Sequence, residues 1–461
     1  MNMKEKNIDL FEKAPIPEVV LRNIIPAIIS MLMVLVYNLA DTFFIGQTGD
    51  PFQVAAVSLA TPVFLLLLAF GNLFGIGGTS VISRALGEKK KDYAKKTSSF
   101  CFWACVAVGA ASMLLAWAFM DTILSFIGTS PDTINYTRSY LSIVAYSSVF
   151  VLISNCFSNI IRAEGKANEA MMGMLIGNLI NVILDPIMIL GLDWGIAGAA
   201  IATVIGNIAG ALYYILYYLR GKSILSINIK DFSVKNKICT SVLAIGIPAS
   251  LGSLLMSVSN IFVNNFIVEY GDMAVAGIGV AMKVTMIAAL LVLGLGQGVQ
   301  PILGYCFGAK KWERYNGVLR FSLLLATILS VILTIICYIG ADYIVNSFLD
   351  DPAAHEYGVQ FSHMLLISAP CLGVLFVFIN AIQAVGAATP SLILSVTRQG
   401  LIYIPLLFIL NNIAGLHGLV YAQPIADYLS CFLATIIYVY TRKKVIIPKL
   451  SISTKDSKLS L

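Results

Sequence analysis

Long apolar segments separated by short polar connections fill almost the whole chain. Twelve of these segments are near or above the roughly 20 residues that an α-helix needs to cross a bilayer. The pattern therefore predicts an all-α integral membrane protein with twelve transmembrane helices, at residues 18–46, 52–82, 97–120, 136–161, 168–190, 196–219, 239–268, 274–305, 317–340, 357–385, 390–411 and 418–440.

The first apolar segment contains one acid, Asp41, toward its far end. At helical spacing Tyr37, Asn38 and Asp41 share one face, so a polar stripe leads up to the carboxylate. An ionised carboxylate that faces lipid is costly, and intramembrane acids normally face a bundle interior. Asp41 is therefore predicted to mark an ion or proton path.

The sequence of this first segment recurs later in the chain. Residues 248–272 align with residues 26–50 without a gap, and Val263 stands where the first copy has Asp41. Six crossings separate the copies, so both halves point the same way across the membrane. This indicates two six-helix lobes related by a parallel internal repeat, with the substrate path between them. Three shorter pairs extend the repeat: 71–90 with 293–311, 161–167 with 382–388, and 195–202 with 415–422.

The repeat also predicts how the chain is divided. The first lobe is expected at 1–219, beginning with a polar lead at 1–17. A polar linker follows at 220–238, the second lobe at 239–445 and a polar tail at 446–461. The lead has neither the short apolar core nor the small-residue cleavage site of a signal peptide, so we expect it to be retained.

Composition and charge agree with a membrane protein. The chain is 58% hydrophobic and only 12% charged, with a mean hydropathy of +0.87, whereas soluble domains average about 25% charged residues. Its net charge of +6 comes from Lys and Arg at the ends of apolar segments, which argues against nucleic-acid binding. These cations lie in alternate connections between the apolar segments. The protein is therefore predicted to lie in the cell membrane with both termini on the cytoplasmic side.

A second acid, Asp185, lies in the fifth apolar segment. Asn178, Asn181 and Asp185 share one helical face, and Thr203 lies near the start of the sixth segment, at the same predicted depth as Asp41. Oxygen ligands of these types suit a proton or a hard cation such as Na⁺. Two carboxylates held close together away from water also form a natural proton carrier. The alternative is a hydrogen-bonded polar plug that only fixes helix packing.

Several motifs resemble those of the multidrug and toxic compound extrusion (MATE) transporters. They are LADTFFIG at 39–46, GEKK at 87–90, NLINVILDP at 178–186 and QGVQPILGYCFG at 297–308, in the same order and on the same helices. The resemblance covers residues 15–445. It implies a V-shaped cavity between two lobes and export of mostly cationic, lipophilic compounds in exchange for H⁺ or Na⁺.

The resemblance also implies roles for particular residues. Asp41, Asn181, Asp185 and Thr203 match the coupling site of the branch whose site lies in the N-lobe, and the family's bend in the first helix falls at Pro26. Asn38 and Asn178 share helical faces with these residues. The additional acidic site that other branches have in the C-lobe is absent from residues 357–385, which contain no acid within the apolar segment.

Other polar and soft side chains give weaker expectations. Lys283, Arg398 and Asp427 are predicted to lie near mid-membrane in the second lobe. Unpaired charges are too costly at this depth, so the three are expected to form an internal ion-pair network. The alternative is a cluster that gates transport or senses substrate. A tolerant drug cavity is expected to be lined by Tyr37, Met33, Met174, Met256, Met286 and Gln300.

These patterns narrow the class of protein. The leading interpretation is a secondary antiporter for small lipophilic cations, embedded in the lipid bilayer. It is expected to be a monomer, with no cofactor and no metal site. The first alternative is a flippase for lipid-linked precursors, which should have a cationic central cavity. A channel and an intramembrane enzyme are the others. GKS at 221–223 lacks the earlier glycine of a nucleotide-binding loop, so ATP drive is not expected.

Overall fold

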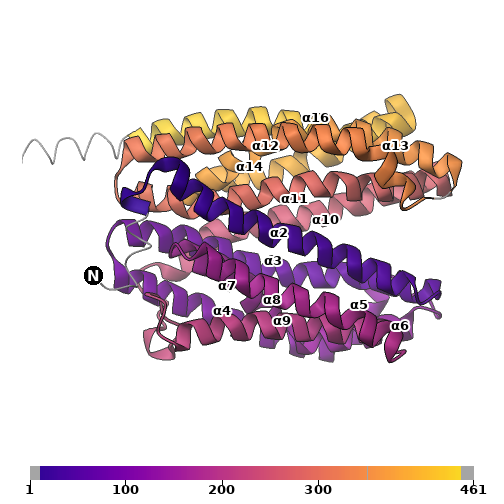
Figure 1. Ribbon diagram of the computed structural model, residues 1–461, viewed down its shortest axis with the longest axis horizontal. Coiled ribbons are helices and arrows are strands. Elements are labelled where there is room, and N and C mark those ends of the chain that lie inside the picture. The colour runs from indigo at the N-terminus through magenta and orange to yellow at the C-terminus, as the bar shows by residue number, and fades with distance from the viewer. Residues whose placement is uncertain (1–10, 350, 448–461) are drawn as a thin grey trace, which may run out of the picture. The chain divides into compact units, whose positions relative to one another are not determined.

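The computed structural model describes residues 11–349 and 351–447, and their regular secondary structure is helical throughout, as predicted (Figure 1). The first half contains α2 (Ile16–Gly46), α3 (Pro51–Gly87), α4 (Lys91–Ala118), α5 (Met120–Phe126), α6 (Ile134–Tyr146), α7 (Ser148–Ala163), α8 (Ala167–Asp185), η1 (Pro186–Gly191) and α9 (Gly195–Leu219). The second half contains η2 (Ile229–Asp231), α10 (Ile238–Ile267), η3 (Val268–Tyr270), α11 (Asp272–Gly308), α12 (Trp312–Asn346), α13 (Pro352–Leu366), α14 (Ala369–Ala384), α15 (Ala388–Val396), η4 (Thr397–Tyr403), α16 (Ile404–Thr441) and η5 (Arg442–Ile446).

The helices account for the twelve predicted crossings. In the described ranges nine helical stretches are long and apolar enough to span a membrane, and two bent pairs, α6–α7 and α13–α14, bring the number to 11. One stretch, Ala388–Ile446, has 59 residues, which is about 90 Å of helix against roughly 30 Å of hydrocarbon. Gly415, with φ 56° and ψ −136°, interrupts this stretch, so it crosses twice. The chain is a multi-pass membrane protein.

The chain forms two compact units whose limits differ from the predicted lobes. The first unit contains Ile29–Ser250, and the second contains Ala14–Ile28 together with the chain from Leu251 onward. The first part of α2 thus belongs to the second unit and the first part of α10 to the first. Each change of unit follows an intrahelical proline, Pro26 or Pro248.

Close backbone contacts explain this exchange. In the second unit, a Cβ added at Gly298 would lie 2.9 Å from the backbone oxygen of Asn23, so only glycine allows α2 to approach α11 there. In the first unit, Ser250 Oγ donates a hydrogen bond to the Ala69 oxygen over 2.7 Å. The sequence repeat alone did not show these contacts.

The polar linker is fixed to the first unit. Ser99 Oγ and Trp103 Nε1, both on α4, donate to the backbone oxygens of Asn228 and Ile227, at 2.7 and 3.2 Å. The segment between α9 and α10 is therefore held against α4 by hydrogen bonds.

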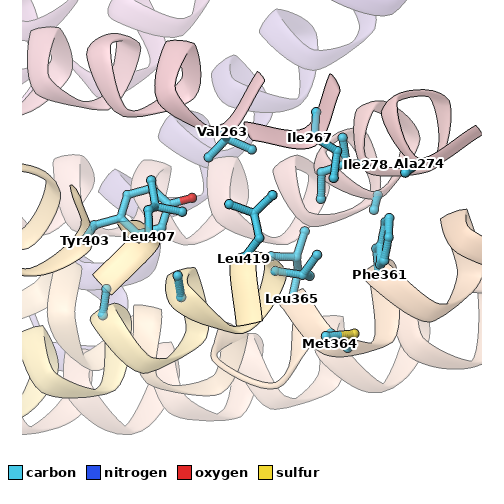
Figure 2. Close-up of a cluster of buried hydrophobic side chains, with 14 residues drawn as sticks. Val263, Ile267, Ala274, Ile278, Phe361, Met364, Leu365, Tyr403, Leu407 and Leu419 are labelled. Carbon is cyan, nitrogen blue, oxygen red and sulfur yellow. The ribbon is translucent and has the colours of Figure 1, made fainter. Parts of the chain in front are cut away.

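An apolar core fills the second unit where the first repeat has its acid. Figure 2 shows Val263, the counterpart of Asp41, in a cluster with Ile278, Phe361 and Leu419 from three other helices. Tyr403, the last residue of the π-helix η4, and Leu407, in the first turn of α16, belong to the same cluster. At the position of Asp41, the second repeat is thus apolar.

Candidate functional site

Glycines bring α8 and α9 into close contact one helical turn away from Asn181 and Thr203. A Cβ added at Gly177 would lie 2.8 Å from the Gly206 oxygen, and one at Gly206 would lie 2.5 Å from the Gly177 oxygen. Larger residues at either position would push the helices apart. This close packing, which small residues at four-residue spacing allow, places Asn181 of α8 beside Thr203 of α9.

Asn181 connects the two helices through its amide. Its Nδ2 atom lies 3.3 Å from Asp185 Oδ1 and 3.3 Å from Thr203 Oγ1. Turning the amide by half a rotation places its nitrogen 3.3 Å from Asp185 Oδ2 and its oxygen 3.2 Å from the Thr203 backbone nitrogen. Asn181 therefore contacts both residues in either orientation. All three side chains are buried, Asp185 completely.

Asp41 of α2 joins this group from a third helix. The carboxylates of Asp41 and Asp185 interact electrostatically with each other and with the Tyr37 hydroxyl. The Asp41 Oδ1 atom is buried and has no hydrogen-bond partner among the described residues. A buried carboxylate oxygen without a donor is energetically costly, so this atom is suited to accept a proton or a cation.

A π-helix follows directly after the buried acid. α8 ends at Asp185, and η1 continues from Pro186 to Gly191. Proline cannot donate the helical hydrogen bond, and π-helical turns occur often at functional sites. The irregular backbone next to Asp185 is consistent with a functional role for this end of α8.

The remaining residues predicted for the site are placed less centrally. Asn38 Nδ2 donates to the Val34 oxygen of its own helix over 2.7 Å, so its amide is already engaged there. Asn178 is half-buried, and its Nδ2 atom has no hydrogen-bond partner in the described chain. Tyr140 of α6, which the sequence did not single out, is buried and interacts electrostatically with both acids. A lone tyrosine in an apolar segment gave no signal for this position.

The predicted C-lobe cluster is only partly formed. Arg398 Nε and Nη2 lie 3.2 and 3.1 Å from Asp427 Oδ1, and Ser368 Oγ and Gln423 Nε2 also donate to this carboxylate. Lys283 is not part of the ion pair, since its ammonium lies 5.1 Å from the centroid of the Phe348 ring. An aromatic face provides a favourable contact for a cation at this depth.

The residues predicted for a drug cavity belong to both units. Tyr37 lies next to the acids, and Met33 and Met174 are partly buried in the first unit. In the second unit Met256 is 48% exposed, Met286 is partly buried and Gln300 is buried. Their common role in a cavity stays a prediction.

Twelve crossings, an internal repeat and a buried pair of acids define a membrane transporter of duplicated helical architecture. The MatE family profile matches the chain twice, at residues 26–187 and 248–409, and the chain belongs to this MATE family.

Relatives and solved structures support the assignment. The chain is 33% identical to the multidrug export protein MepA of Staphylococcus aureus (strain MRSA252), over 95% of this chain and 96% of that protein. It is also 33% identical to MepA of Staphylococcus haemolyticus (strain JCSC1435), over 98% and 99%. A solved outward-facing multidrug resistance MATE family transporter of the MOP superfamily superposes with a TM-score of 0.89 at 23% identity, covering 96% of this chain and 99% of that one. This likeness shows the common fold.

Proposed function

We propose that this protein exports lipophilic, mostly cationic compounds in exchange for H⁺ or Na⁺. Its relatives over nearly the full length are named multidrug export proteins. Acids rather than cations form the polar site around Asp41 and Asp185 in the first unit. Both features favour drug export over the alternative of lipid-precursor transport.

The observation that carries the proposal is the pairing of Asp41 with Asp185. Both are carboxylates inside membrane helices, and neither forms an ion pair with Lys or Arg among the described residues. A structural acid normally has a basic partner at this depth. An acid pair without one can exchange protons or cations, with Asn181 and Thr203 supplying further polar atoms.

The transport cycle would be alternating access between two states. Uptake of a proton or Na⁺ removes or compensates the negative charge of the site, and α2 contains Pro26, where a helix can bend. The alternation of positively charged connections favours a cytoplasmic location for both termini. In this orientation the site lies in the outer half of the membrane, where an inward-directed ion gradient can load it.

Uptake into inverted membrane vesicles tests the proposal, because their cytoplasmic face points outward and export carries drug into the lumen. A fluorescent lipophilic cation is added outside, and its accumulation is followed under an imposed pH gradient and then under a Na⁺ gradient. We expect one gradient to drive transport in wild type and not in Asp41→Asn. Equal transport without either gradient would contradict antiport.

A further inference from the structure

A polar chamber lies at the outer end of the first unit, beyond the acid site. It has a volume of about 370 Å³, and its lining comes from the turn after α2, from α3, α6 and η1, and from the turn before α9 and its first residues. The lining includes the side chains of Gln47, Thr48, Gln53, Tyr136 and Asp193. The connections 47–53 and 191–195 contain no Lys or Arg, which assigns this end to the outer face.

The chamber wall is held in place by hydrogen bonds. Gln53 Oε1 accepts from the Ile196 nitrogen over 2.8 Å, which ties α3 to the start of α9. Beside it, the Asp50 carboxylate accepts a hydrogen bond from Tyr136, and this bond holds the pKa of Asp50 below its usual value. Asp50 thus lies next to a lining residue, and the acid Asp193 is part of the lining itself, so the chamber favours cations over anions.

Three apolar residues lie between the acids and the chamber along the chain, and one of them, Ile189, also forms part of the chamber lining. Ile45 follows Asp41 by one helical turn, Ile189 follows Asp185 by four positions, and Ala199 precedes Thr203 by one turn. These three side chains form one buried cluster, at most 2% exposed. They come from the same three chain segments that supply the acid site.

The order along each segment is the same. Asp41 is followed by Ile45 on α2, and Gln47 of the chamber lies in the turn after that helix. After α8, Asp185 is followed by Ile189 and then by Asp193 of the chamber. α9 runs in the opposite direction and shows the reverse order, from Gly195 of the chamber to Ala199 and Thr203. Acid site, apolar layer and chamber are therefore three successive levels of one unit.

We propose that the chamber is the outer entry site for the coupling cation and that Ile45, Ile189 and Ala199 are the gate between it and the acids. A packed apolar layer excludes water, and ion pathways use hydrophobic constrictions to block conduction by dewetting. The inference rests on the proposed function, because it specifies how the ion would reach Asp41 and Asp185. It requires that a hydrated monovalent cation or a water-borne proton enters the chamber from outside.

Accessibility to a cationic thiol reagent tests the three levels independently of transport. Thr48→Cys and Thr203→Cys are treated from the outside with a membrane-impermeant methanethiosulfonate ammonium reagent, with wild type giving the background of the eight native cysteines. We expect rapid labelling at position 48 and about tenfold slower labelling at position 203. Adding Ile189→Thr to Thr203→Cys should remove most of that difference. Slow labelling at 48, or equally rapid labelling at 203 without the gate substitution, would overturn the proposal.

Ion leakage provides the second measurement. Proteoliposomes with Ile189→Thr should admit H⁺ or Na⁺ in the absence of drug about tenfold faster than wild type, which corresponds to a barrier lower by about 1.4 kcal/mol. Ile187→Thr is the matched control, since Ile187 lies in the same π-helix and is 50% exposed. Leakage through the control as well, or through neither variant, would overturn the gate. If the thiol results hold but Asp41→Asn still exports drug, the proposed coupling function fails and the gate stands.

Discussion

Arg398 and Asp427 form an ion pair inside the second unit, with Nη2 of the arginine 3.1 Å from Oδ1 of the aspartate. Their side chains are only 16% and 3% exposed. Breaking a buried pair by removing one partner leaves an uncompensated charge and typically costs about 3–5 kcal/mol. The pair is therefore expected to matter for stability whatever its role in transport.

Arg398→Met should lower the free energy of unfolding by about 3 kcal/mol or more, because Asp427 is left buried without its cation. Unfolding in one detergent measures the change. Lys283→Met is the control, since Lys283 contacts the Phe348 ring and not this carboxylate. The double variant Arg398→Met/Asp427→Leu should recover most of the loss. A double variant as unstable as Arg398→Met would show that the charge imbalance is not the cause.

Asp41→Asn should abolish coupled export and leave folding intact. Asparagine keeps the shape of the side chain but cannot carry a proton or a negative charge. Efflux and the unfolding midpoint are measured together, with Asp121→Asn as control, because Asp121 is 84% exposed and pairs with Arg138 near the surface. Wild-type efflux by Asp41→Asn at normal expression would exclude this carboxylate from coupling.

Cationic drug affinity should fall as pH drops through the range in which the Asp41–Asp185 pair takes up protons. Each proton removes a negative charge that would otherwise attract the drug, and a hundredfold preference between the two states corresponds to about 2.7 kcal/mol. Equilibrium binding of a fluorescent cation between about pH 5 and 9, on either side of neutrality, measures the effect. Asp41→Asn should make affinity nearly independent of pH. A flat wild-type curve that Na⁺ also leaves unchanged would argue against competition at this site.

Glu164 in the turn after α7 should affect stability in a pH-dependent way. Its carboxylate is buried and accepts hydrogen bonds from Tyr217, Ser223 and the Ile224 nitrogen, at 2.7, 2.7 and 3.2 Å. Burial raises the pKa of Glu164 above its ordinary value. Its contribution to stability is then fully present below the unfolded pKa of about 4.3 and declines as pH rises through the folded pKa.

Glu164→Gln should remove this pH dependence and lower the free energy of unfolding by about 1–3 kcal/mol. The reason is that the glutamine amide nitrogen, itself a donor, would face a hydrogen-bond donor that now points at a carboxylate oxygen. The measurement is the unfolding midpoint from about pH 4, near the unfolded pKa, up to neutrality. Glu169→Gln is the control, since Glu169 accepts only from Tyr213 in a partly buried position. Parallel pH curves for wild type and Glu164→Gln would disprove the role of this group.

Much of the candidate site could be predicted from the sequence. The positions of Asp41, Asn181, Asp185 and Thr203 at one depth follow from helix direction and membrane length, and the structure brings them together. The contributions of Tyr140 and of Ile45, Ile189 and Ala199 could not be predicted, because a tyrosine or an isoleucine in an apolar segment has the same local pattern whether it faces lipid, a core or a polar site.

The sequence by itself determined the twelve crossings, the duplication and the replacement of Asp41 by Val263 in the second repeat, because membrane insertion depends on local hydropathy and charge. Only the tertiary structure decided which charges meet. Arg398 pairs with Asp427, whereas Lys283 contacts Phe348. Val263 lies in an apolar core, whereas Asp41, its counterpart in the first repeat, interacts with Asp185. Hydropathy gives the depth of a side chain, whereas its partners depend on helix rotation and on close contacts such as Gly177 with Gly206.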